Sequence, residues 1–431
     1  MLSQKNRERF WVLYFGFAFF WALQAFALLG QWMHDKELQA RKIDGRPYIS
    51  DFVSFYGSGV LARQCLTKPT KIYDGPTQIE LETKLTAPVV PEAPFSNPNT
   101  PVTFVVLLPL SLLTLDGAWI TWGLVTLLAS IGILLATFVK PLRHWFAKLT
   151  AVTAFAASYA TWFSIRLGST SCLLFPMVLS FFHFLKGGNL IATAAMACIG
   201  TIKLQYAPYL LSIGTARFGW KFPAVLAGFC AILLGICTAV LGWDNIVAFP
   251  QAFLTNEASS QIVGVQPEKM QNLRGILVLI TGSDSKPIHY LSAGVCLTAA
   301  GCLFFIWKKL DWKDSVRFNL LASATVLLML VSSPHTHTQD YILAFIPCLL
   351  LFLAADRNDT NIGTRDRLIL KIAAVSFVYL SWILFFLDFL FRLCKIQPFA
   401  LWAAVVAAYV LRLYFTTAST APNESSNAGA I

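Results

Sequence analysis

The chain consists largely of apolar runs of about twenty residues, separated by short segments that carry most of the Lys and Arg. Runs such as 10–33, 118–139 and 222–242 are long enough to cross the hydrocarbon core of a bilayer as helices. Only 13% of the 431 residues are charged and 56% are hydrophobic, whereas soluble domains contain about 25% charged residues. We therefore predict an all-α polytopic membrane protein with about 12 transmembrane helices.

The distribution of Lys and Arg predicts how these helices are oriented. Basic residues gather in short loops, for example 140–148, 217–221 and 308–317, and short cytoplasmic loops carry such an excess. The pattern places both ends of the chain in the cytoplasm and the long segments 34–100 and 244–287 on the outer face. Topology then explains the net charge of +11, and we expect no nucleic-acid partner.

The segments outside the long runs predict a simple organisation. Residues 1–415 are expected to form a single transmembrane domain, and the small, polar tail 416–431 to be disordered and cytoplasmic. The short run 101–115, which contains Pro109, predicts a re-entrant or interfacial piece. Nine Cys without CxxC spacing indicate apolar packing residues, not a disulfide framework or a zinc site.

Two charged residues stand out against this apolar background. Asp51 opens the sequence Asp-Phe-x-x-Phe-Tyr directly after the first run. A carboxylate among aromatic side chains can act as a general base, although an Asp that caps a helix is the commoner case. Lys203 interrupts the apolar run 190–211, so we expect two short spans to meet there on the outer side. It is either a functional cation or a Lys whose ammonium reaches the interface.

Further candidates lie at the ends of other runs. His335 and His337 flank a Thr, and Asp340 follows closely. Two His and an Asp can hold a metal or a phosphate, or they can form an ordinary polar turn. Arg166 and Arg274 are candidates for phosphate contacts or for interfacial anchors. In the predicted topology all of these residues lie on the outer face.

The motifs that are absent also limit the function. We find no Walker loop, dinucleotide fingerprint, zincin helix or nucleophile elbow, so nucleotide chemistry on a soluble domain is unsupported. A transporter or flippase for a lipid-linked or anionic solute is one alternative, and a non-catalytic scaffold is another. A transport path predicts polar residues through the membrane centre, and the chain lacks two matching halves. Polar clusters gathered on one face favour an enzyme.

The order of these clusters resembles glycosyltransferase family 87, a polytopic family that includes bacterial polyprenyl-phosphate-mannose-dependent mannosyltransferases. The resemblance covers about 51–347 and rests on segments in this order: Asp51-Phe52-x-x-Phe55-Tyr56, Gly57-Ser58-Gly59, Ile72-Tyr73-Asp74, Phe95-Ser96-Asn97-Pro98, Pro109-Leu110 with Trp119 and Trp122, Leu167-Gly168-Ser169, Lys203, Asn272-Leu273-Arg274-Gly275, and Ser333-Pro334-His335 through Asp340-Tyr341. Two segments depart from the family pattern: 95–98 replaces an aromatic-Pro-Pro, and Gly168-Ser169 replaces a Gly-Gln.

The resemblance implies a C-type glycosyltransferase fold, a helical bundle with short or re-entrant helices in its outer loops. It implies inverting transfer of a sugar, with mannose as the expected one, from a polyprenyl-phosphate donor to a lipid or glycan acceptor. The active site would face the periplasmic or extracytoplasmic side of the cell (inner) membrane, in contact with membrane lipids. No cofactor is implied, and any metal requirement is left open.

The resemblance also assigns roles to residues. Asp51 matches the family's catalytic Asp in the first outer loop, and Asp44 and Asp74 are the next candidates in that loop. The remaining expected contacts to the donor phosphate or substrate are Tyr56, Arg166, Lys203, Arg274, His335, His337 and Asp340.

Overall fold

The computed structural model describes residues 13–25, 51–87, 99–138, 145–258, 269–356, 362–386, 390 and 393–419. Within these residues the chain is helical and contains no strand, which confirms the predicted all-α class. Asp44, the segment 95–98 and residues 420–431 lie outside the described part of the chain.

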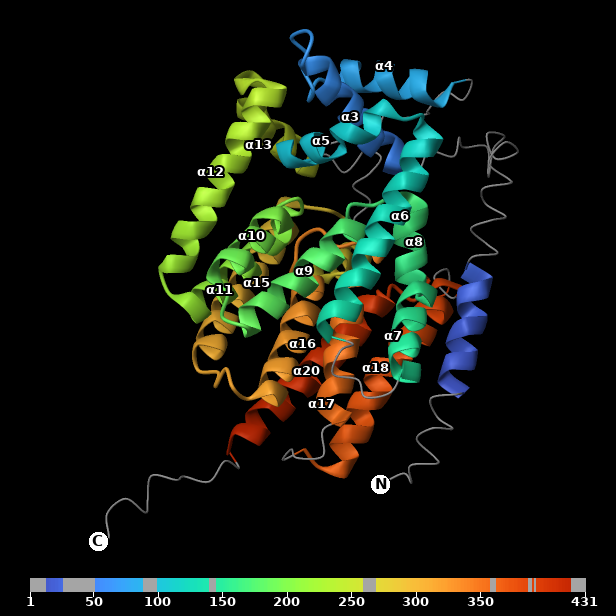
Figure 1. The fold of residues 1–431 in the computed structure, drawn as a ribbon, viewed down its shortest axis with the longest axis vertical. Helices are drawn as coiled ribbons and strands as arrows, with labels where there is room; N and C mark the ends of the chain where they lie inside the picture. Colours follow the sequence, from blue (N-terminus) through green and yellow to red (C-terminus); the bar gives the residue numbers. More distant parts are fainter. Residues whose placement is uncertain are drawn as a thin grey trace.

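A bundle of long helices forms the body of the molecule (Figure 1). Helix α16 (Ser315–Ser332) is buried along most of its length and packs against α17 (Phe345–Asp356) and α20 (Pro398–Ser419). Helices α9 (Ser171–Lys186) and α18 (Thr364–Phe386) contribute to the same large apolar core. Because α16 is surrounded by protein, its sequence is apolar on all sides.

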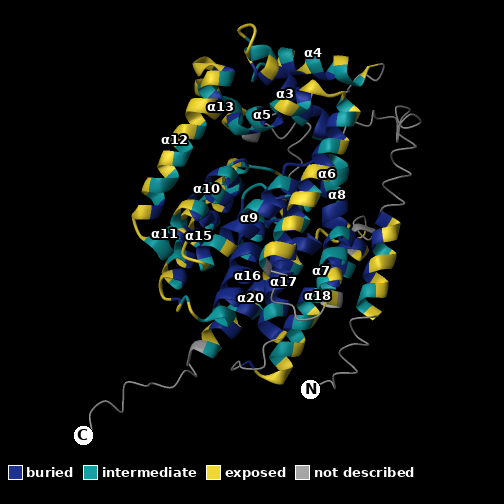
Figure 2. Cartoon of the chain, in the orientation of Figure 1, coloured by how far each residue is buried: buried dark blue, intermediate teal, exposed yellow. Residues whose placement is uncertain are grey.

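Many helices present apolar side chains to the outside. Six helices in the described chain are long and apolar enough to cross a membrane: Leu115–Thr137, Lys221–Leu241, Lys286–Lys308, Ser315–Ser332, Thr338–Asp356 and Pro398–Thr417. Five shorter apolar helices accompany them: Leu13–Ala25, Pro101–Leu112, Lys148–Ala157, Ser171–Lys186 and Leu190–Gly200. Helix α12 (Lys221–Leu241) is mostly exposed along its length (Figure 2), which fits contact with lipid. The protein is a polytopic membrane protein, and the number of about 12 spans stays a prediction.

Four shorter helices lie together at one end of the bundle (Figure 1), and we name this group the cap. It contains α3 (Asp51–Cys65), α4 (Gly75–Thr86), α5 (Pro101–Leu107) and α13 (Trp243–Ala258). The side chain of Asn245 accepts a hydrogen bond from the backbone N–H of Ile72 and donates to the carbonyl of Thr70. These bonds tie α13 to the segment before α4.

One predicted boundary needs correction, and one segment agrees with expectation. The segment 244–287 begins within α13 and contains α14 (Leu273–Thr281), which agrees with the short helices expected in the loops of the bundle. Phe249 in α13 packs against Tyr73, with 5.9 Å between ring centroids, and this contact holds α13 against the segment before α4. The tail was expected to be disordered from residue 416, but α20 continues to Ser419.

The apolar run 145–167 does not form one continuous helix. It consists of α7 (Trp145–Ala157) and α8 (Tyr159–Leu167), with Ser158 between them. The hydroxyl of Ser158 accepts a hydrogen bond from the N–H of Thr161 at 3.2 Å, which caps the start of α8. A capping Ser therefore divides what the apolar pattern alone predicts as one helix.

The expected interruption at Lys203 is confirmed. Helix α10 (Leu190–Gly200) ends before it, and a single turn, η3 (Leu204–Tyr206), leads into α11 (Ala207–Phe218). Pro208 lies in the first turn of α11, where its missing N–H breaks no helical bond. The chain reverses here, at the end of the bundle that faces the cap.

Helix α8 meets α3 at a glycine. Gly168 ends α8 with a left-handed φ of +63°, and a Cβ built on it would lie 2.5 Å from Cδ2 of Phe52. Phe52 is buried and directly follows Asp51. The absence of a side chain at Gly168 therefore lets the first turn of α3 approach α8.

We expect Gly168→Ala to lower the melting temperature of the purified protein more than Gly282→Ala does. Gly282 also has a left-handed φ, +71°, but a Cβ there meets nothing within 4 Å. Both changes add left-handed strain of roughly 1–2 kcal/mol. Only Gly168→Ala adds overpacking, typically ~1–3 kcal/mol. Thermal unfolding in detergent measures the difference, and equal losses would contradict the proposed contact with Phe52.

Candidate active site

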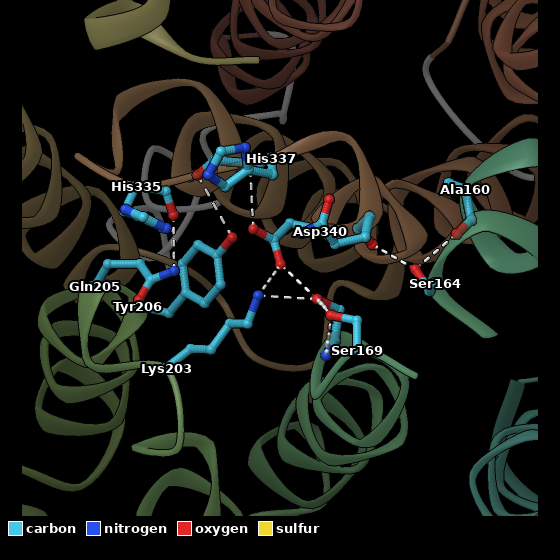
Figure 3. A network of polar contacts seen from close by, with 12 residues as sticks. Ala160, Ser164, Ser169, Lys203, Gln205, Tyr206, His335, His337 and Asp340 are labelled. Atoms are coloured by element: carbon cyan, nitrogen blue, oxygen red, sulfur yellow. Dashed lines mark hydrogen bonds and ion pairs between the residues drawn. The ribbon is translucent and has the colours of Figure 1, made fainter. Parts of the chain in front are cut away.

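A buried ion pair lies at the end of the bundle below the cap. The ammonium of Lys203 pairs with Oδ1 of Asp340, and it donates a hydrogen bond to the hydroxyl of Ser171 at 2.9 Å (Figure 3). The Asp340 side chain is fully buried, whereas that of Lys203 is 15% exposed. Ser171 also donates to Oδ1 of Asp340 at 2.5 Å. The three side chains form one closed network.

The chain brings these residues together from three places. Ser171 is the first residue of α9, Lys203 lies in the break between α10 and α11, and Asp340 lies in the turn η5 (Thr338–Ala344). The hydroxyl of Ser169 lies 2.9 Å from that of Ser171 and extends the network toward α8. Polar groups at helix ends thus meet in an otherwise apolar bundle.

The segment 333–337, which we name the His turn, faces the break at Lys203. The side-chain amide of Gln205 donates to the carbonyl of His335 at 2.7 Å (Figure 3). The rings of His335 and His337 pack edge to face, with centroids 4.8 Å apart. The N–H of His337 donates to Oδ2 of Asp340 at 3.0 Å. The ion pair and the two imidazoles therefore belong to one polar cluster.

Asp51 comes to this cluster from the cap. It is the first residue of α3, and its neighbour Phe52 packs against α8. Burial raises the pKa of the Asp51 carboxyl from its ordinary value to about 6, while nearby Lys203 lowers it and Asp340 raises it. These charge interactions place Asp51 within electrostatic range of the Lys203–Asp340 pair. A carboxylate of this kind is a stronger base than one in water and is still mostly ionised at neutral pH.

Tyr56 and Arg166 occupy positions beside this cluster and make other contacts. The buried hydroxyl of Tyr56 donates to the carbonyl of Leu113 at 2.8 Å and so anchors α3. The guanidinium of Arg166 lies over the ring of Trp162, 5.2 Å from its centroid. The carbonyl of Arg166 accepts a hydrogen bond from the indole of Trp119 at 3.3 Å. Contacts of Tyr56 and Arg166 with a substrate remain predictions.

Arg274 pairs with a carboxylate of its own. It is buried in the first turn of α14, and its Nε and Nη2 donate to Oδ1 and Oδ2 of Asp284 at 3.1 and 2.8 Å. The Nε2 of His289 lies 2.8 Å from Oδ1 of Asp284. Burial by itself raises the pKa of Asp284, but Arg274 and His289 outweigh it and hold the pKa below the ordinary value. The charge of Arg274 is thus balanced inside the protein, and any contact with a phosphate remains a prediction.

Four polar residues of these networks were not expected from the sequence: Ser171, Gln205, Asp284 and His289. The polar run 169–171 between two apolar runs was a usable signal for Ser171. Asp284 lies ten residues after Arg274, at a spacing that predicts no contact, and only the fold of α14 brings the two together. In the described part of the chain, no group of three His, Cys, Asp or Glu side chains is arranged to hold a metal ion.

We expect Arg274→Met to destabilise the protein by about 3–5 kcal/mol, because it removes the arginine partner of the buried Asp284 and leaves only His289 beside it. The double variant Arg274→Met, Asp284→Asn removes both charges and should recover part of this loss. Because the folded pKa of Asp284 is lowered, the pair stabilises above the ordinary carboxyl pKa and its contribution is lost as the pH falls through the folded value. Thermal unfolding in detergent measures each effect. A single variant as stable as wild type would show that Arg274 has no structural role.

Comparison with known proteins gives a family. Residues 98–334, more than half of the chain, match the model of glycosyltransferase family 87. The match includes Arg166, Lys203 and Arg274, whereas Asp51 and Asp340 lie outside its bounds. Searches of curated proteins and of solved structures gave no match. Because this match covers more than half of its length, the chain belongs to glycosyltransferase family 87.

Proposed function

We propose that this membrane glycosyltransferase is an inverting enzyme that transfers mannose from a polyprenyl-phosphate donor to a lipid or glycan acceptor. The observation that carries the proposal is that Asp51, at the start of the cap helix α3, interacts electrostatically with the Lys203–Asp340 pair of the bundle. A half-buried carboxylate and a partly exposed cation then lie near each other at the junction of cap and bundle. Transfer from a phosphate-linked sugar needs both groups.

Asp51 is the general base of the proposed reaction. The acceptor hydroxyl gives its proton to the Asp51 carboxylate while its oxygen forms a bond to the anomeric carbon. With a pKa of about 6, the carboxylate is mostly ionised at neutral pH and can accept that proton. Because the attacking oxygen enters on the face opposite the departing phosphate, the configuration at the anomeric carbon is inverted.

Lys203 is proposed to stabilise the leaving phosphate. As the bond between the anomeric carbon and oxygen breaks, its electron pair stays on the phosphate, which gains a negative charge. An ammonium carries three protons, and the described part of the chain supplies Asp340 and Ser171 as acceptors for two of them. The third is available to a phosphate oxygen. His335 and His337 lie in the same cluster and are the expected additional donors.

The surroundings of the site support a donor with a lipid tail. The cluster lies where the cap meets a bundle whose outer helices expose apolar side chains, such as Ile232 and Leu234 on α12. A phosphate held at Lys203 leaves an attached polyprenyl chain next to this apolar surface and the membrane. A soluble nucleotide sugar has no lipid tail that could contact this apolar surface.

We expect purified protein to transfer mannose from polyprenyl-phosphate mannose to a membrane extract, with a rate that falls as the pH drops below about 6, because Asp51 is then protonated. Asp51→Asn should lower the transfer rate by ~10²–10⁴-fold, the usual contribution of a general base. Because the folded pKa of Asp51 is raised, its ionisation costs stability above that pH, and Asp51→Asn should melt no lower than wild type at neutral pH.

Asp74→Asn is the matched control for this experiment. Asp74 caps α4, where its Oδ2 accepts a hydrogen bond from the N–H of Thr77 at 3.0 Å, and Asn caps helices about as well. Its transfer rate should stay near that of wild type. Normal turnover by Asp51→Asn would exclude Asp51 as the base. Transfer by wild type from a nucleotide sugar in lipid-free conditions would exclude the proposed donor.

The cap is proposed to lie on the extracytoplasmic side of the cell membrane. Lys309 lies in the loop between α15 (Lys286–Lys308) and α16, whereas Lys68 lies between the cap helices α3 and α4. We expect a membrane-impermeant maleimide to label Lys68→Cys on intact cells and to label Lys309→Cys only after the membrane is opened. The native cysteines give the background, which is measured on unmodified protein. If both positions are labelled equally on intact cells, the proposed topology is wrong.

A further inference from the structure

Asp340 joins three segments that are far apart in the sequence. Its Oδ1 accepts a hydrogen bond from Ser171 at 2.5 Å and pairs with Lys203, and its Oδ2 accepts one from the N–H of His337 at 3.0 Å (Figure 3). The partners come from the start of α9, the break after α10 and the His turn. Both oxygens of this fully buried carboxylate are thus engaged by protein groups.

A carboxylate in this position is poorly suited to bind the substrate. The donor phosphate is an anion, and a second anion beside it opposes its binding. A buried carboxylate is tolerated only where partners compensate for lost water, and contact with a sugar hydroxyl would compete with those partners. Asp340 therefore calls for a different role from the substrate contact that the sequence led us to expect.

We propose that Asp340 is the positioning residue of this site: it fixes the positions of the Lys203 ammonium and the His turn relative to each other, and it balances the charge of Lys203 near Asp51. A Lys side chain has a flexible four-carbon stem, so its ammonium needs such an anchor to keep one position. The proposal rests on the proposed function, in which Asp51 is the general base and Lys203 contacts the leaving phosphate.

The charge balance has a consequence for Asp51. An unpaired ammonium near Asp51 favours the ionised carboxylate and makes it a weaker base, whereas an ammonium paired with Asp340 does so much less. The largest charge interactions of Asp51 are with Lys203, which lowers its pKa, and with Asp340, which raises it. The charged side chains of the neighbouring helices are not among these: Glu80, Glu82 and Lys84 on α4, Asp116 on α6 (Leu115–Ile133) and Arg166 on α8.

The test is an infrared titration of the whole purified protein in detergent between pH 4 and 8. The band of the protonated Asp51 carboxyl is assigned by its loss in Asp51→Asn. In wild type it should disappear as the pH rises through about 6. In Asp340→Asn the unpaired Lys203 should move this transition to lower pH. In Lys203→Met, Asp340→Asn, where neither charge remains, it should return toward the wild-type position.

This measurement needs no substrate, so it separates the two proposals. If wild type transfers nothing from polyprenyl-phosphate mannose while the titrations behave as expected, the proposed donor is wrong and the role of Asp340 stands. If the Asp51 transition in Asp340→Asn stays at the wild-type pH, the claim that Asp340 balances the charge of Lys203 is wrong. Asp284→Asn, which breaks a buried pair away from this cluster, should lower stability and leave the Asp51 transition in place.

The kinetics of transfer test the positioning role. Asp340→Asn should lower kcat at least tenfold without raising the KM for the donor, because Lys203 keeps its charge but loses its anchor. A tenfold higher KM with unchanged kcat would instead identify Asp340 as a substrate contact. If Asp340→Asn does not fold, Ser171→Ala serves as the second variant, since it keeps every charge and removes a hydroxyl that holds both partners. If the kcat of Ser171→Ala equals that of wild type, the proposed positioning role of Asp340 is wrong.

Discussion

The structure of the site depends on one buried ion pair, between Lys203 and Asp340. Ionised groups inside an apolar bundle are costly unless they are paired and hydrogen-bonded, and here Ser171 and the backbone of His337 complete the pairing. The pair therefore fixes how α9, the break after α10 and the His turn lie relative to one another. If one partner is lost, the other is left buried and charged, so the arrangement has few alternatives.

The cap depends on that arrangement for its own function. Asp51 is carried by α3, and α3 is positioned by the packing of Phe52 on Gly168 and by the hydrogen bond from Tyr56 to Leu113. None of these contacts involves the ion pair directly. The base and the cation therefore come from two separately built parts of the molecule, and their distance depends on how well cap and bundle fit together. Small residues at the junction, Gly168 above all, allow the close approach that such a site requires.

Much of this could be predicted from the sequence, for reasons that are specific to membranes. Long apolar runs permit few structures other than helices, so the fold class followed from composition, and Lys203 stood out because charge is rare in such runs. The pairing of Lys203 with Asp340 could not be predicted, because the two are 137 positions apart and many polar residues end neighbouring runs. The break at Ser158 was also missed, since a capping side chain overrides a hydrophobic pattern.

Two carboxylates of the described chain show how environment separates chemistry from structure. Asp284 is buried against Arg274 and His289, which hold its pKa below the ordinary value, so it stays ionised and binds its partners. Asp51 also loses contact with water, but its strongest charge interactions are with an ion pair that is already balanced, so burial dominates and raises its pKa to about 6. A carboxylate whose charge is not fully compensated by partners destabilises the fold above that pH, where it is ionised. This cost is unexplained if Asp51 only caps α3, and it is expected if Asp51 must accept a proton from a sugar acceptor.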